Sequence, residues 1–369
     1  MFNLPSPTPS SGTVSQAQEL ELALISNPRK AINYKKFLKY NRGGNVDFQP
    51  VRLDIETISR CNFACQMCAV SEWQNGQRAE DMTLLKLKDA LSGQHGIVEV
   101  KLTGLGEPML QGDEYFGFID YFREQHIWVR MVTNGSLLHI NDNALKLAES
   151  GVNDITMSLD GSSAEVFEKI RRKSNFKQTS QNMLKLNKCL AERGQRITKA
   201  WCCVQKDNLE DLEMILIKAA ELGFPELTFS LSLHGWGKSS LLEKNIELTK
   251  ANKDLVTEDR CHQLIEIGNN HNIRTTFWNV SQKYGYSKGE ELCPWPFERL
   301  YLSSDFRIVP CCMIGNPDTF EIPKGRFPEN SNLDSVWFGN NYNDFRRAHR
   351  IGELPLVCKN CYSCAGNKI

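Results

Sequence analysis

The chain has 369 residues, and its 44 lysines and arginines balance 44 acidic side chains. A formal net charge of zero argues against partners held by bulk charge, such as nucleic acid or an acidic membrane. There is no run of 18 apolar residues and no basic-then-apolar N-terminus, so we expect a soluble, cytoplasmic protein.

Residues 1–50 are expected to precede the main fold. Residues 1–15 consist largely of proline, serine and threonine and have too few apolar side chains to fold alone. Gln16 to Ile25 has a helical pattern. We interpret this segment as a tail and a helical extension that packs on the fold.

A strand-then-helix pattern repeats six times from residue 51 to about 232. Alternating strands and helices indicate parallel strands with right-handed crossovers. Six such units fit an open, partial version of the eightfold TIM barrel, an α/β fold, which we place at 51–240. The predicted strands are Val51–Ile58, Val98–Thr103, Ile127–Thr133, Asp154–Leu159, Ile197–Val204 and Glu226–Ser232.

Three cysteines directly follow the first predicted strand, at the spacing C-x3-C-x2-C: Cys61, Cys65 and Cys68. The C-terminal ends of strands are where barrel folds build their sites. Three thiolates can hold three corners of a cubane iron–sulfur cluster and leave the fourth iron open. A zinc site is the alternative, which we disfavour because zinc usually takes four ligands and this loop offers no fourth Cys or His.

Thirteen cysteines, an odd number in clustered positions, favour metal ligation over a disulfide framework. After a polar connector at 241–290, which includes a predicted strand at Arg274–Trp278, the segment 291–369 forms a small cysteine-rich unit. In it Cys293 and Cys311 bracket a predicted hairpin, and Cys358 and Cys361 form a C-x2-C pair. Their spacing suits either zinc or an iron–sulfur cluster.

The first cysteine motif resembles that of the radical S-adenosylmethionine superfamily. The resemblance implies a 4Fe–4S cluster on Cys61, Cys65 and Cys68, with S-adenosylmethionine chelating the open iron through its amino and carboxylate groups. Members usually carry an aromatic residue, which touches the adenine, before the third cysteine. This chain has Met67 there, whose thioether can also pack on a ring.

Segments behind the later strands resemble the cofactor-binding segments of that superfamily. Gly104-Leu105-Gly106-Glu107-Pro108 resembles the motif that meets the methionine amino group: glycines permit close backbone approach, and a carboxylate accepts from an ammonium. By resemblance, the other cofactor-binding residues are Asn134, Ser158 and Asp160 (ribose and carboxylate), Arg171 (carboxylate), and Val204 and Asn208 (adenine).

Alternatives stay open at several of these positions. Arg172 competes with Arg171, and Asn208 is equally suited to be a helix N-cap. His234, behind the sixth strand, is the candidate for proton transfer or substrate binding.

The tail resembles the SPASM/twitch extension of the same superfamily, which carries auxiliary 4Fe–4S clusters. The resemblance implies one auxiliary cluster, and the pattern is most similar to that of the 2-deoxy-scyllo-inosamine dehydrogenases. Asp305-Phe306 replaces the usual Asp-Gly turn. The implied ligands are Cys293, Cys311, Cys358 and Cys361, with Cys312 and Cys364 as substitutes.

These resemblances imply a radical S-adenosylmethionine oxidoreductase, supplied with electrons by a flavodoxin or ferredoxin. We expect two-electron oxidation of a small molecule resembling an aminocyclitol or a sugar. The alternative substrate is a ribosomally made peptide that is crosslinked, given a thioether or epimerised; the segment before residue 51 is too short for a complete winged-helix leader-binding domain. A non-catalytic iron–sulfur or zinc protein is a third alternative, which the full set of motifs disfavours.

Overall fold

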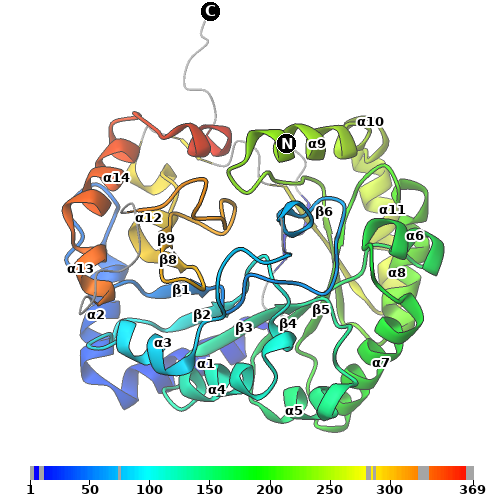
Figure 1. Cartoon of the computed structure of the whole chain (residues 1–369), viewed down its shortest axis with the longest axis horizontal. Coiled ribbons are helices and arrows are strands. Elements are labelled where there is room, and N and C mark those ends of the chain that lie inside the picture. Colours follow the sequence, from blue (N-terminus) through cyan, green and yellow to red (C-terminus); the bar gives the residue numbers. More distant parts are fainter. Residues whose placement is uncertain are drawn as a thin grey trace, which may run out of the picture.

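The computed structural model describes residues 4–7, 12–73, 76–279, 284–285, 288–322 and 332–362. Its centre is one nine-stranded sheet in the order β7-β6-β5-β4-β3-β2-β1-β8-β9 (Figure 1). All neighbouring strands are parallel except the β8–β9 hairpin. The strands are β1 Arg52–Ile55, β2 Glu99–Leu102, β3 Trp128–Thr133, β4 Asp154–Ser158, β5 Thr198–Cys203, β6 Glu226–Ser230, β7 Arg274–Trp278, β8 Arg299–Leu302 and β9 Ile308–Val309.

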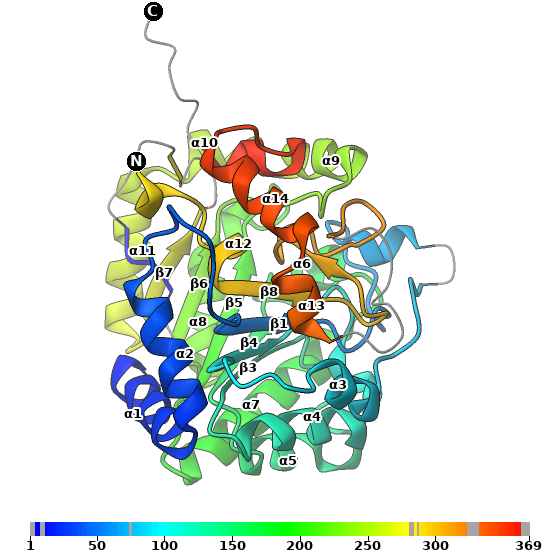
Figure 2. The ribbon, with the colours of Figure 1, turned by 90° about the vertical axis from the view of Figure 1, so that its left-hand side faces the viewer.

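The six predicted strands are confirmed, and the sheet extends beyond them at both edges. The connector supplies β7 as a seventh parallel strand beside β6. The tail hairpin β8–β9 joins the opposite edge, where β8 pairs with β1 (Figure 2). Core and tail therefore share one continuous sheet, which fixes the tail against the first strand.

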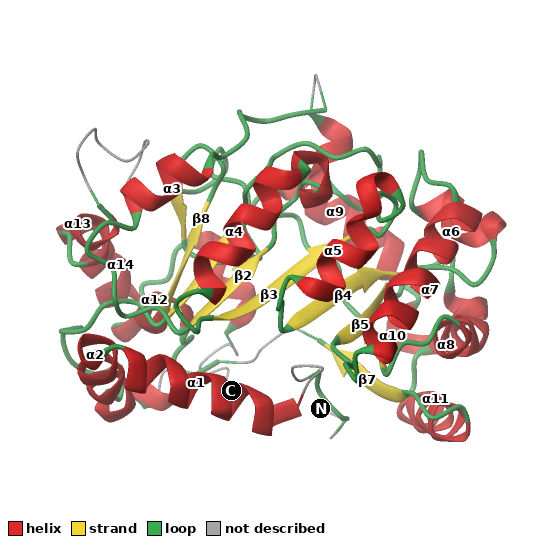
Figure 3. Ribbon diagram, turned by 90° about the horizontal axis from the view of Figure 1, so that it is seen from below, coloured by secondary structure: helices red, strands yellow, loops and turns green. Residues whose placement is uncertain are grey.

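Helices surround the sheet on its outer side (Figure 3), and none of those in the described ranges is long and apolar enough to cross a membrane. The N-cap side chains of six helices accept backbone hydrogen bonds, so local sequence sets where these helices begin. The helices are α1 Gly12–Ser26, α2 Pro28–Lys39, α3 Leu84–Ala90, α4 Asp113–Arg123, α5 Asn143–Glu149, α6 Ala164–Ile170, α7 Phe176–Glu192, α8 Leu212–Glu221, α9 Ser239–Thr249, α10 Asn252–Leu255, α11 Glu258–Asn270, α12 Trp295–Glu298, α13 Leu333–Trp337 and α14 Asn340–Arg350.

The two faces of the strands differ in chemistry. Alternate residues such as Leu53, Val100 and Leu227 are fully buried in the main hydrophobic core. Each such side chain stabilises the fold by roughly 1.5–3 kcal/mol. The other face carries polar residues toward the barrel interior, because successive side chains of a strand point to opposite faces.

A belt of charged residues crosses the barrel interior near the start of the strands, with one residue of alternating sign on each of β1 to β7. Neighbours pair at 3.1–3.9 Å, so most of these buried charges are compensated. The belt consists of Arg52, Glu99, Arg130, Asp154, Lys199, Glu226 and Arg274.

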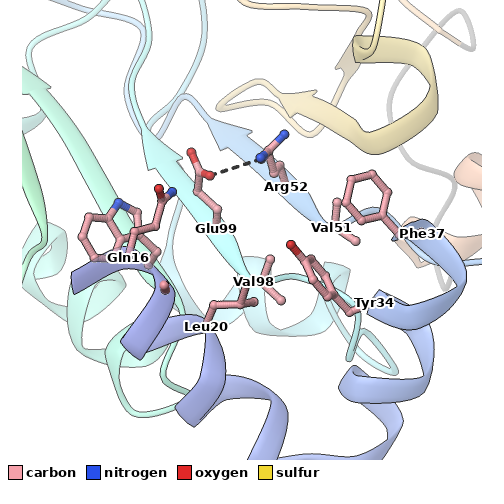
Figure 4. A pocket seen from close by; sticks show the side chains of 10 residues that line it. Gln16, Leu20, Tyr34, Phe37, Val51, Arg52, Val98 and Glu99 are labelled. Atoms are coloured by element: carbon pink, nitrogen blue, oxygen red, sulfur yellow. Dashed lines mark hydrogen bonds and ion pairs between the residues drawn. The ribbon is translucent and has the colours of Figure 1, made fainter. Parts of the chain in front are cut away.

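Helices α1 and α2 lie across the end of the barrel where the strands begin. Between them and the starts of β1 and β2 is a cavity of about 230 Å³, lined by Tyr34, Arg52 and Glu99 among others (Figure 4). The cysteine loop and the glycine motif follow the C-terminal ends of the same strands. The cavity is therefore at the opposite end of the barrel from these motifs.

Candidate functional site

The cysteine motif lies in a loop, residues 61–68, that is held against the end of α6. Ala64 N donates to Arg172 O at 2.8 Å, and Gln66 N donates to Ile170 O at 3.0 Å. The Arg172 side chain completes the contact by donating from Nε to Ala64 O at 2.9 Å. The backbone of this cluster loop is thus fixed by the protein itself.

The three thiols of the cluster loop pack together with the apolar side chains of Phe63 and Met67. Burial, and then the charge of Cys65, raises the pKa of Cys68 to about 12. Burial, and then Glu107, raises the pKa of Cys61, and both other thiols add to that rise, in keeping with their common packing. Without a metal, these thiols resist ionisation. Bound iron would hold them as thiolates, so a group of this kind fits an iron–sulfur cluster.

Arg171 and Asp160 form a buried ion pair beside this loop. Arg171 Nε donates to Asp160 Oδ2, and Nη1 donates to Cys65 Sγ at 3.6 Å. The other Asp160 oxygen accepts from Cys203 N at 2.7 Å. Arg171 therefore faces the thiols, whereas its rival Arg172 binds the backbone of the loop.

Glu107 is fully enclosed at the start of a short 3-10 helix after β2. Its Oε1 accepts from Thr133 Oγ1 at 2.7 Å and Met109 N at 3.1 Å, and its Oε2 accepts from Asn134 N at 2.7 Å. Burial raises the pKa of Glu107 to about 7, although these hydrogen bonds oppose the rise. A carboxylate has about four acceptor sites, so capacity for one further donor remains.

The two glycines of the motif are required by contacts within the chain. A Cβ on Gly106 would lie 2.3 Å from Ile58 O and 2.6 Å from Arg60 O. One on Gly104 would lie 2.6 Å from Glu56 Cγ. The sequence predicted that these glycines let the backbone approach a ligand. In the structure they let it approach the segment that follows β1. The glycine motif and the start of the cluster loop therefore pack as one unit.

Asn134 links β3 to the cluster loop. Its Nδ2 donates to Asn62 Oδ1 at 3.0 Å and reaches Cys61 Sγ at 3.8 Å, while its Oδ1 accepts from Ser136 N at 2.9 Å. Ser158 ends β4 and is buried. Both residues lie on the end of the sheet that carries the thiols.

Asn208 occupies the N-cap position of the short 3-10 helix Leu209–Asp211, but its side chain makes no capping hydrogen bond to that helix. Its Nδ2 donates to Asp160 O at 3.0 Å and to Cys203 O at 3.1 Å, and it thereby joins the loops after β4 and β5. Val204 is fully buried in the main core, and Met67 packs in an apolar cluster with Ile170 and other residues.

His234 follows β6, and its carbonyl accepts from Asn245 Nδ2 at 2.6 Å. Burial lowers the pKa of His234 to about 4, so its imidazole is neutral at pH 7. Its role in proton transfer stays a prediction.

The four predicted ligands of the tail come together from three separate segments. Burial, and then Cys312, raises the pKa of Cys311, and the Cys358 and Cys293 thiols add to the rise. Burial, and then Cys293 and Cys361, raises the pKa of Cys358. Within the described ranges no three His, Cys, Asp or Glu side chains are placed to hold a single metal ion. The same holds for the three thiols of the cluster loop. The auxiliary cluster on the four tail thiols stays a prediction, which their mutual electrostatic effects support.

The proposed substitute Cys312 is the next residue after Cys311 and acts on its thiol. Burial, and then Asp54, raises the pKa of Cys312 to about 11, and Lys101 and Arg299 are the next charges that act on it. Cys312 thus lies near Cys311 and also near these charged residues. Cys364 lies outside the described residues.

A buried ion triad, which the sequence did not reveal, connects core and tail. Arg78 donates to Glu56 Oε2 at 2.6 Å and to Asp305 Oδ1 at 2.9 Å. All three side chains are at most 6% exposed. Arg78 lies ten residues after Cys68 and carries no recognisable motif, so only its three-dimensional contacts identify it.

Two family models match this chain. The radical SAM superfamily model matches residues 55–232, and that of the SPASM iron-sulfur cluster-binding domain matches residues 293–362. The first spans the cluster loop, the last four residues of the first predicted strand and the other five predicted strands. The second spans the four tail thiols.

Among curated proteins, mycofactocin maturase MftC of Mycolicibacterium smegmatis is 28% identical over 176 residues, 47% of this chain and 43% of the maturase. A GTP 3',8-cyclase of Aliarcobacter butzleri is 34% identical over 138 residues, 36% of this chain and 40% of the cyclase. The matched stretches span less than half of these relatives.

Among solved structures, SuiB of Streptococcus suis bound to precursor peptide SuiA aligns with a TM-score of 0.61 and 15% identity, over 85% of this chain and 70% of SuiB. The protein anSMEcpe with bound AdoMet and Cp18Cys peptide aligns with a TM-score of 0.56 and 18% identity, over 86% of this chain and 92% of the other. At these identities the similarity shows the fold.

Proposed function

Because the chain belongs to the radical SAM superfamily and carries a SPASM iron–sulfur domain, we propose that it is an oxidoreductase that removes a hydrogen atom and then an electron from a substrate carbon. Bound S-adenosylmethionine and a 4Fe–4S cluster would supply the 5′-deoxyadenosyl radical, and an auxiliary 4Fe–4S cluster would take up the remaining electron. A flavodoxin- or ferredoxin-type protein would supply the first electron. The observation that carries the proposal is that the structure groups both predicted sets of thiols.

In this proposal the chain's own residues bind, orient and insulate the cofactors. Cys61, Cys65 and Cys68 hold the core cluster in a loop that α6 supports. Arg171 places a positive charge beside Cys65, which suits the methionine carboxylate as well as the cluster. Glu107, with one acceptor site left, is placed to take a hydrogen bond from the methionine ammonium.

Two substrate classes follow from different observations. The tail pattern favours a small molecule that is oxidised at an alcohol. A peptide substrate is favoured by the relatives, which include a maturase and a structure with a precursor peptide bound.

The cleavage of S-adenosylmethionine tests the proposed activity before any substrate is known. Anaerobically reconstituted protein with a chemical reductant should release 5′-deoxyadenosine, and Cys65→Ala should abolish the release because two thiolates do not anchor a cubane there. Cys189→Ala, on α7 away from both thiol groups, is the matched control and should retain it. Undiminished release by Cys65→Ala would contradict the assignment.

A further inference from the structure

Three polar residues form a row across the inner face of the sheet where core and tail meet. Asp54 on β1 is the register partner of Lys101 on β2 and of Tyr301 on β8. Their sequence neighbours on these strands, such as Leu53 and Leu300, belong to the main core. The three side chains therefore point the other way, into the barrel interior.

Several polar atoms in and beside this row lack hydrogen-bond partners. Within the described part of the chain, the buried atoms Asp54 Oδ2 and Tyr301 Oη make no hydrogen bond, and the same is true of Arg299 Nε beside them. Lys101 is half-buried and has no ion pair or hydrogen bond among the described residues. An unsatisfied buried polar group costs about 1–3 kcal/mol, so such a row is expected to bind something polar.

The charges of the row indicate what it binds. Arg299 lies 3.8 Å from Asp54 and 3.5 Å from Glu298. The Lys101 ammonium attracts Asp54 only from a longer distance, so it remains able to pair with an anion directly. The ammonium, the Tyr301 hydroxyl and Arg299 Nε are three donors, which suits an anion. Asp54 Oδ2 is a single acceptor next to them.

We propose that Lys101, Tyr301 and Asp54 form a substrate subsite for a carboxylate group whose neighbouring N–H or O–H donates to Asp54. This deepens the proposed function, on which it rests. The strands of the row lead to the cluster loop after β1, the Gly104–Glu107 motif after β2 and the Asp305 turn after β8. A substrate anchored in the row would thus extend toward the cofactor end of the barrel.

The carboxylate has two sources, a small hydroxy or amino acid and the C-terminus of a peptide, and one binding experiment separates them. The probes are L-lactate, L-alanine and tri-L-alanine, each compared by calorimetry with its own amide on the reconstituted protein. We expect at least one acid to bind about tenfold more tightly than its amide, because a charged hydrogen bond is lost in the amide. Preference for lactate or alanine indicates a small molecule, and preference for tri-alanine indicates a peptide end.

Substitutions assign that preference to the row. Lys101→Met should abolish the preference for acid over amide, and Tyr301→Phe, which keeps the ring, should weaken acid binding several-fold. Lys86→Met, on the exposed side of α3, is the matched control and should bind as the wild type does. Equal binding of every acid and its amide, or an unchanged preference in Lys101→Met, would overturn the subsite. Failure of the proposed activity would instead appear as wild-type protein that releases no 5′-deoxyadenosine.

Discussion

The Arg171 guanidinium donates a hydrogen bond to Cys65 Sγ at 3.6 Å. On its other side it is held by Asp160, which is fully buried. A donor of this kind, together with its positive charge, stabilises the reduced form of an iron–sulfur cluster.

Arg171→Met should therefore lower the reduction potential of the core cluster. We expect a decrease of roughly 60 mV, which for one electron corresponds to about 1.4 kcal/mol. A redox titration followed by electron paramagnetic resonance measures it. Arg172→Met is the control, since that side chain binds the Ala64 carbonyl and, among the described residues, no thiol. Equal potentials in both variants would contradict the role of Arg171.

The triad of Glu56, Arg78 and Asp305 predicts a large effect on stability. Arg78→Met leaves the buried Glu56 carboxylate without its cation and Asp305 with Arg307 alone, which should reduce the free energy of unfolding by about 3–5 kcal/mol. Arg60→Met removes a comparable pair with Asp81, but those side chains are 35% and 30% exposed, so its cost should be about 0–1 kcal/mol. Similar denaturation midpoints of the two variants would show that the triad does not hold the tail to the core.

Glu107 predicts a pH dependence of stability. Burial raises the pKa of Glu107 to about 7, so between pH 4.5 and 7 the folded state holds a proton that the unfolded state has released. The wild type should therefore lose stability relative to Glu107→Gln as pH rises through this range, by up to about 3 kcal/mol. Thermal midpoints of both proteins at pH 5 and pH 8 give the difference, and parallel profiles would argue that Glu107 is ionised throughout.

Phe306 adopts a left-handed backbone conformation, with φ at 62°, in the turn between β8 and β9. Such a conformation disfavours side chains other than glycine. Phe306→Gly and Phe306→Ala both lose the packing of the ring, so their difference isolates the backbone. The glycine variant should be more stable than the alanine variant by about 1 kcal/mol in chemical denaturation; the reverse order would exclude strain at this turn.

The sequence was sufficient for the parts of the fold that local patterns encode. Alternating apolar residues predicted all six parallel strands, and the cysteine spacings predicted both groups of thiols. The same pattern could not place β8, because its pairing with β1 joins residues about 250 positions apart. The position of β7 beside β6 was missed for the same reason: a strand can be recognised locally, but its neighbour cannot.

The sequence predicted which residues belong to the candidate site. It did not predict which atoms each of these side chains contacts. The choice between Arg171 and Arg172 depends on which side of the α6 terminus faces Cys65, and no spacing rule gives that. Asn208 was open as a helix cap, yet its side chain joins two loops instead. Lys101 and Asp54 were passed over, although charged residues at alternate positions of otherwise apolar strands were a signal of a polar barrel interior.

The number of irons bound by the protein tests the account most directly. Reconstituted wild type should bind about eight irons as two cubane clusters, and the Cys358→Ala/Cys361→Ala double variant about four while still cleaving S-adenosylmethionine slowly. Cys189→Ala should match the wild type. About four irons in the wild type, or one zinc per chain that the double variant lacks, would contradict the two-cluster account.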